Sequence, residues 1–136
     1  MRSTLIDAGP MIALFNRRDQ YHLLVVNFLK GFHGRLLTTW PVITEASHML
    51  DFSTTAQINL LEWINRGGLQ LIDIEEDKID RMISLTRKFE DVPMDLADAS
   101  LIVVSEMMNV REIASIDSDF YVYRDIRNRY LTNVLM

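Results

Sequence analysis

Four acidic side chains, far apart in the sequence, stand where they could share one site: Asp7, Glu45, Asp98 and Asp117. Asp7 and Asp117 each follow a short apolar segment with the character of a strand, so their carboxylates would leave parallel strands at the same edge of a sheet. Glu45 and Asp98 lie within the first two turns of expected helices, where the helix dipole favours carboxylates. Helices that follow parallel strands begin at that edge, so we expect all four to converge.

Such a cluster of carboxylates would hold a metal ion. Like charges raise one another's pKa values, so three or four acids together need a cation. The chain has no cysteine, and its three histidines are not spaced as a site, so the ligands would be oxygen atoms. Oxygen ligands suit Mg²⁺ or Mn²⁺ rather than Zn²⁺. A hard metal ion at the open edge of an α/β sheet is typical apparatus for hydrolysing phosphodiester bonds, with one ion or with two about 3.5–4 Å apart.

Each acid also has a purely structural interpretation. Asp95 and Asp98 have the spacing of a helix-capping arrangement, with Asp95 at the N-cap. Asp7 would cap the helix that begins near it, Asp117 would form an Asx turn, and Glu45 would be a solvated flank of its helix. These interpretations do not explain why all four acids lie at the same edge. Asp98 lies in a helix that is otherwise apolar on every side, and a carboxylate in such a place needs a partner.

The elements that must position these acids alternate between strands and helices. The expected strands are Ser3–Ile6, Leu36–Thr39, Leu69–Ile74, Glu112–Ile116 and an edge strand within Leu131–Leu135. The expected helices are Met11–Phe15, Tyr21–Phe32, one from Pro41, one from Ser53 or Thr54, Glu75–Phe89 and Asp95–Met108. This order predicts a three-layer α/β/α fold around a mainly parallel sheet of four to five strands, formed by residues 1–136 as a single domain.

Two of these helices have contrasting patterns. The helix from Asp95 to Met108 is apolar almost all round, which places it in the interior. The helix from Glu75 to Phe89 alternates charged and apolar residues, and we expect it at the surface. Its core-facing residues are expected to be Ile79, Met82, Ile83 and Leu85.

Composition and net charge limit the classes of protein to which this chain can belong. Of 136 residues, 49% are hydrophobic and 24% are charged, which is ordinary for a globular protein. No apolar run approaches the roughly 20 residues of a membrane helix, and we see no signal peptide, so we expect a cytoplasmic protein. The formal net charge is −5, which by itself argues against a protein that coats nucleic acid. The four candidate ligands account for most of that charge, however, so a nucleic-acid substrate remains compatible with it.

Four motifs, in this order and covering nearly the whole chain, resemble the PIN-domain family of metal-dependent ribonucleases, and in particular the VapC-type toxins of toxin–antitoxin pairs. The motifs are Leu5–Ile6–Asp7–Ala8–Gly9–Pro10, Val42–Ile43–Thr44–Glu45–Ala46, Met94–Asp95–Leu96–Ala97–Asp98–Ala99 and Ser115–Ile116–Asp117–Ser118–Asp119–Phe120. Each motif alone is weak, and the four in order are fairly specific.

By this resemblance Asp7, Glu45 and Asp98 match the core metal-binding acids, and Asp117 matches a more variable fourth. Asp119 is a substitute for Asp117, and Asp95 is an additional candidate ligand. The resemblance implies Mg²⁺ or Mn²⁺, an RNA substrate, a homodimer and an antitoxin protein that occludes the site. The chain departs from the family in having Ala8 where a Thr or Ser hydroxyl often helps to orient the acids.

Three residues are candidates for contacting the RNA: Arg17 and Arg18 through phosphates, and Trp40 through base stacking. The structural alternatives are a solvated surface charge for the two arginines and a packing role for the tryptophan. Two alternatives to the toxin function also stay open. One is a catalytically silent PIN-like module that binds a protein partner, and the other is a housekeeping RNA-processing nuclease without an antitoxin.

Overall fold

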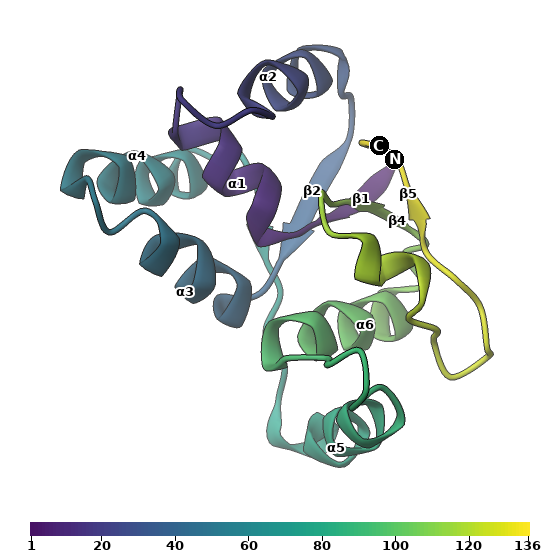
Figure 1. The fold of residues 1–136 in the computed structure, drawn as a ribbon. Coiled ribbons are helices and arrows are strands. Elements are labelled where there is room, and N and C mark those ends of the chain that lie inside the picture. The colour runs from purple at the N-terminus through teal and green to yellow at the C-terminus, as the bar shows by residue number, and fades with distance from the viewer.

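The computed structural model describes residues 1–136 as a five-stranded sheet between two layers of helices (Figure 1). All neighbouring strands are parallel, and their order in the sheet is β3-β2-β1-β4-β5. The strands are β1 (Ser3–Ile6), β2 (Arg35–Thr38), β3 (Gln70–Leu71), β4 (Glu112–Ala114) and β5 (Thr132–Asn133). The predicted three-layer fold is confirmed, with five strands and no antiparallel member of the sheet.

The helices occupy both faces of this sheet. They are α1 (Ala8–Phe15), α2 (His22–Gly31), α3 (Trp40–Met49), α4 (Thr54–Asn65), α5 (Ile79–Lys88) and α6 (Leu96–Met108), with short 3₁₀ helices η1 (Glu76–Lys78) and η2 (Ser118–Tyr121). Helices α1 to α4 gather on one side, and α5 and α6 lie on the other (Figure 1). None of the helices is both long and apolar enough to cross a membrane.

Strand order explains why the helices change sides. The chain moves outward from β1 through β2 to β3 and then returns across the sheet to β4 on the far side of β1. Right-handed crossovers that run in opposite directions put their helices on opposite faces. The reversal makes the boundary between β1 and β4 a switch point, and the carboxyl ends of strands at a switch point border a crevice.

Helix α6 forms the centre of its layer. Residues 97–105 of this helix are all buried, as its uniformly apolar sequence predicts. It packs between α3 and α5, so solvent reaches little of its circumference. The helix ends at Asn109, whose φ of 53° is the left-handed conformation common at helix ends. Asp98 is therefore carried into the interior by the packing of its neighbours.

The segment between β3 and α6 differs from its prediction. The expected strand Leu69–Ile74 pairs only over Gln70–Leu71, with one more backbone bond from Ile72 to Thr38, before the chain leaves the sheet. The expected helix Glu75–Phe89 begins as η1. Ile79 and Ile83, predicted to face the core, are 52% and 43% exposed. The reason is that α5 packs on one helix only, so Leu85 is buried while the flanks of its apolar stripe stay in solvent.

We predict that Leu101→Ala destabilises the protein by about 2–5 kcal/mol, because Leu101 on α6 is fully buried and its removal leaves a cavity. Met107→Ala on the same helix removes a side chain that is 42% exposed, and we expect a loss of about 0.5 kcal/mol or less. Urea unfolding followed by circular dichroism measures both. Equal losses would show that α6 is not packed as described.

Candidate metal centre

Three of the four predicted acids come together at the switch point. Asp7, Asp98 and Asp117 each offer a carboxylate oxygen, and these oxygens all lie within 4.8 Å of one another. Asp7 follows β1, Asp117 lies just beyond β4, and Asp98 is on the first turn of α6. We call these three residues the acidic cluster. Three separate elements supply it, so the cluster exists only when β1, β4 and α6 are assembled.

Asp7 is buried at the end of β1, with 5% of its surface exposed. It occupies the N-cap position of α1, yet its side chain makes no capping hydrogen bond, so the capping interpretation does not explain it. The Ser115 hydroxyl donates to Asp7 Oδ2 over 3.1 Å. Burial raises the pKa of Asp7 to about 7, against the opposing effects of the Ala8 backbone N–H and the Ser115 hydroxyl.

Asp98 is equally buried, with 6% of its surface exposed. The Tyr123 hydroxyl donates to Asp98 Oδ2 over 2.7 Å. Burial raises the pKa of Asp98 to about 7, partly offset by the bond from Tyr123. The backbone N–H of Asp98 donates to Asp95 Oδ1 over 2.8 Å, so Asp95 is the N-cap of α6 and the Asp98 side chain is left for the cluster.

Asp117 is exposed and has two roles. Its Oδ1 accepts a hydrogen bond from the Asp119 backbone N–H over 2.9 Å, which is the turn expected from its position. Its own backbone N–H donates to the Ser115 hydroxyl over 3.0 Å. The turn therefore fixes the Asp117 carboxylate at the mouth of the cluster, where it also meets Asp7 and Asp98.

The remaining predicted acids border the cluster rather than join it. Glu45 on α3 and Asp95 are exposed, and Asp119 is half-buried. Partial burial and the negative charges of Asp95 and Asp117 raise the pKa of Glu45. Partial burial and the adjacent Asp117 raise the pKa of Asp119. These residues add negative charge around the cluster without placing an oxygen among the three.

The donor set fits a hard divalent cation. No lysine or arginine forms an ion pair with any of these acids; the acids that do form ion pairs are Glu62, Glu106, Glu112 and Asp125. The buried charge is therefore uncompensated by the protein. Carboxylate oxygens with no sulfur and no histidine among them suit Mg²⁺ or Mn²⁺.

Sequence reasoning missed the two hydroxyls that orient the cluster, those of Ser115 and Tyr123. Ser115 stands two residues before Asp117 at the end of a predicted strand, which was a usable signal. It supplies a hydroxyl to Asp7 although Ala8 has none. Tyr123 lies in a tail without periodicity, and only folding brings it to Asp98. Its ring packs edge-on against Phe89 and Phe120, with centroids 5.3 and 5.1 Å away.

The three predicted RNA contacts lie at different places. Arg17 and Arg18 are exposed just beyond the C-terminal end of α1, which is the end remote from Asp7. The eight residues of α1 separate them from the cluster by about 12 Å. Trp40 begins α3, five residues before Glu45, and is 54% exposed. Trp63, by contrast, packs edge-on against Phe15.

We predict that the metal-free protein becomes less stable as the pH rises from about 5 to about 8. The pKa values of Asp7 and Asp98 are about 7 in the folded protein, against an ordinary value of 3.8. Between those values the folded state holds protons that the unfolded state has released, so the free energy of unfolding falls as the pH increases. Each proton contributes at most about 1.4 kcal/mol per pH unit.

Urea unfolding in EDTA across that range measures the slope. Asp98→Asn removes one titrating group and should flatten it, whereas Asp80→Asn on the exposed start of α5 should not. A wild-type stability that is constant or increases with pH would contradict the buried state of the cluster.

We predict that Tyr123→Phe lowers the affinity for Mn²⁺ by about tenfold or more, because the residues that orient metal ligands matter nearly as much as the ligands. The ring contacts with Phe89 and Phe120 remain, so folding should be preserved. Tyr121→Phe is the matched control, since its hydroxyl donates to the Met136 carbonyl at the surface. Titration calorimetry measures binding, and equal affinities for the two variants would refute the orienting role.

Comparison with known proteins finds relatives of one kind. No protein-family model matches the chain. Ribonuclease VapC26 of Mycobacterium tuberculosis (strain ATCC 25618 / H37Rv) is 20% identical over 115 residues, which cover 83% of this chain and 85% of that protein.

Two solved structures share the fold. The first is VapC20 of Mycobacterium tuberculosis, described as a toxin that cleaves the sarcin–ricin loop. Its TM-score is 0.78 at 15% identity, over 88% of this chain and 93% of that one. The second is VapBC2 from Rickettsia felis bound to a DNA fragment from its promoter. The TM-score is 0.64 at 14% identity, over 96% of this chain and 98% of that one. The chain therefore has the fold of these two VapC structures, and ribonuclease VapC26 is a distant relative by sequence.

Proposed function

We propose that this protein is a divalent-metal-dependent endoribonuclease that hydrolyses RNA phosphodiester bonds, and that it is the toxin of a type II toxin–antitoxin pair. The observation that carries the proposal is the acidic cluster, in which oxygens of two buried carboxylates and one exposed carboxylate lie within 4.8 Å of one another and none is paired with a cationic side chain. Likeness to ribonuclease VapC26 supports RNA as the substrate.

The protein's own groups have distinct roles in this reaction. Asp7, Asp98 and Asp117 would hold Mg²⁺ or Mn²⁺, directly or through water. Such an ion, when bound, orients water and offsets the charge that develops on the phosphate. The hydroxyls of Ser115 and Tyr123 each donate to one oxygen of Asp7 and Asp98 and so restrict the orientation of these carboxylates.

Glu45 borders the crevice from α3 and completes the proposed set. Its pKa is raised by partial burial and by the neighbouring carboxylates of Asp95 and Asp117. A carboxylate with a raised pKa is a better proton acceptor near neutral pH, so Glu45 suits the removal of a proton from attacking water. We assign it that role.

The proposed partners follow from the relatives. VapBC2 is a toxin–antitoxin pair, which supports an antitoxin protein that would cover the crevice of this chain. We further propose a homodimer that acts on RNA in the cytoplasm. A catalytically silent binding module is the competing function, and the presence of all four motif acids favours the nuclease. A housekeeping nuclease would have the same site, and the presence or absence of a neighbouring antitoxin distinguishes it.

We predict that the purified protein cuts a structured RNA mixture with Mg²⁺ or Mn²⁺ but not with EDTA. Asp98→Asn should reduce cleavage by about 100-fold or more, because it removes a charge from the cluster while keeping the shape of the side chain and an acceptor for Tyr123. Asp80→Asn makes the same change on exposed α5 and should cut as the wild type does. Gel electrophoresis of end-labelled RNA measures the rates.

Identical trace activity in the wild type and Asp98→Asn would indicate contamination and would leave the proposal without support. If the protein binds metal and cuts no RNA in the mixture, the silent binding module becomes the better account.

A further inference from the structure

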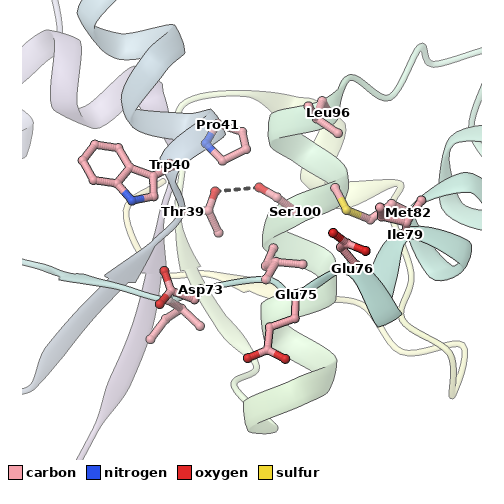
Figure 2. A pocket seen from close by; sticks show the side chains of 12 residues that line it. Thr39, Trp40, Pro41, Asp73, Glu75, Glu76, Ile79, Met82, Leu96 and Ser100 are labelled. Atoms are coloured by element: carbon pink, nitrogen blue, oxygen red, sulfur yellow. Dashed lines mark hydrogen bonds between the residues drawn. The ribbon is translucent and has the colours of Figure 1, made fainter.

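An apolar pocket of about 540 Å³ opens between the starts of α3 and α6 and the segment that joins β3 to α5 (Figure 2). Trp40 and Pro41 form one wall, and Leu96, Met82 and Ile79 form the opposite wall. Ile79, whose exposure the sequence pattern did not predict, is part of this wall. The volume of the pocket is within the usual range for small-ligand sites. We call it the apolar pocket.

The apolar pocket shares part of its lining with a second groove, which contains two of the acids that border the acidic cluster. Trp40, Pro41 and Leu96 line both the pocket and a neighbouring groove that contains Glu45 and Asp95. The exposed side chains of Trp40 and Leu96 thus form a ridge, with carboxylates of the proposed active site on one side and the pocket on the other. An RNA strand with a phosphate at the cluster would have a nearby nucleotide at this ridge.

The polar groups at the floor of the pocket are two buried hydroxyls, those of Thr39 and Ser100. The Ser100 hydroxyl donates its single proton to the Ala97 carbonyl over 2.7 Å. The Thr39 hydroxyl lies 2.6 Å from that of Ser100 and must therefore donate to it. Both hydroxyl protons are used within the protein, and the two side chains are 1% and 0% exposed, so any groups that read the edge of a base lie at the rim. Figure 2 shows this pair between Trp40 and Glu76.

The rim carries three acidic residues that can accept hydrogen bonds. Asp73, Glu75 and Glu76 line the pocket, and no lysine or arginine does. Figure 2 shows the Glu76 carboxylate on the side of Ser100 and Met82, and that of Glu75 farther from Ser100. Three carboxylates without a cation repel phosphate groups. This charge favours entry of a nucleotide with its base first, and the Glu76 carboxylate favours a base edge that carries donors.

We propose that the apolar pocket binds a guanine base next to the phosphate that is cut. This inference rests on the proposed ribonuclease function and names a sequence preference for it. Guanine has two adjacent donors, N1–H and N2–H₂, that can bind the two oxygens of one carboxylate. Adenine and cytosine pair one amino donor with a ring acceptor, and uracil has one donor between two carbonyl acceptors, so each would set an acceptor against the Glu76 carboxylate.

Trp40 and Glu76 have separate parts in this proposal. Trp40 supplies an aromatic face, and stacking on such a face favours every base. Glu76 supplies the acceptors that select guanine. Single-stranded RNA is commonly read in this way, with a base turned out of its stack and its edge hydrogen-bonded. Affinity should therefore depend on Trp40, and the preference among bases on Glu76.

The first experiment measures base binding without catalysis. Trp40 and Trp63 are the chain's two tryptophans, so Trp63→Phe makes Trp40 the sole fluorescent reporter. Guanosine, added in EDTA, should quench this fluorescence with an affinity about tenfold higher than that of inosine, which lacks the 2-amino group, or of adenosine, cytidine or uridine. Glu76→Gln should remove the preference. Asp77→Asn, on the same 3₁₀ helix but outside this pocket, should keep it.

The second experiment maps the ends of fragments from a random RNA library cut by the wild type, Glu76→Gln, Trp40→Ala and Asp77→Asn. Guanine should dominate one position beside the cut for the wild type and Asp77→Asn, and that bias should fall about tenfold in Glu76→Gln. Trp40→Ala should slow cutting of all sequences, seen as a higher KM.

The two experiments separate the two claims. Guanosine binding without any RNA cleavage would overturn the proposed function and leave the base site standing. RNA cleavage with no guanosine preference and no guanine beside the cut would overturn the base site alone. Quenching by an arginine-containing peptide and by no nucleoside would also overturn it, and would assign the pocket to a basic protein segment.

Discussion

Negative charge that the protein does not neutralise dominates this structure. Asp7 and Asp98 are buried within the acidic cluster, Asp117 closes it, and no ion pair of the molecule reaches any of the three. A buried carboxylate without a counter-charge either takes up a proton or binds a cation. Both outcomes are consistent with pKa values near 7 for Asp7 and Asp98. The fold thus holds two buried carboxylates that take up protons near neutral pH unless a cation offsets their charge.

The scaffold concentrates this charge at its switch point. Parallel strands β1 and β4 end side by side, and α6, buried on all sides, brings its first turn to the same edge. Two neutral hydroxyls, from Ser115 and Tyr123, hold one oxygen each of Asp7 and Asp98. Hydroxyl donors fix the orientation of a carboxylate without neutralising it, as a lysine or arginine would. The arrangement therefore preserves the charge that a cation needs, at some cost to the stability of the metal-free protein.

The parts of this site that follow short-range rules could be predicted from the sequence. Asp7 and Asp117 were expected at the sheet edge because strand ends are visible as apolar runs that stop at a polar residue. Asp98 was expected there because a carboxylate in a uniformly apolar helix needs a partner. The place of Glu45 depends on how α3 is rotated against its neighbours, which periodicity does not determine, and its carboxylate lies outside the cluster.

What could not be predicted depends on long-range packing. Tyr123 reaches Asp98 from a tail with no helical or strand pattern, through contacts with Phe89 and Phe120 that only the folded chain makes. The outward position of Ile79 and Ile83 follows from α5 having one neighbouring helix, a fact of topology rather than of its own sequence. That same exposure creates a wall of the apolar pocket beside the site.

The most direct measurement is the anomalous X-ray scattering of a crystal of the wild-type protein soaked in Mn²⁺. The account predicts an anomalous peak within coordination distance of carboxylate oxygens from Asp7, Asp98 and Asp117, with Ser115 and Tyr123 still bound to the other oxygens of Asp7 and Asp98. A peak that touches none of these three residues would contradict it. So would a fully soaked crystal with an empty cluster from a preparation that still cuts RNA.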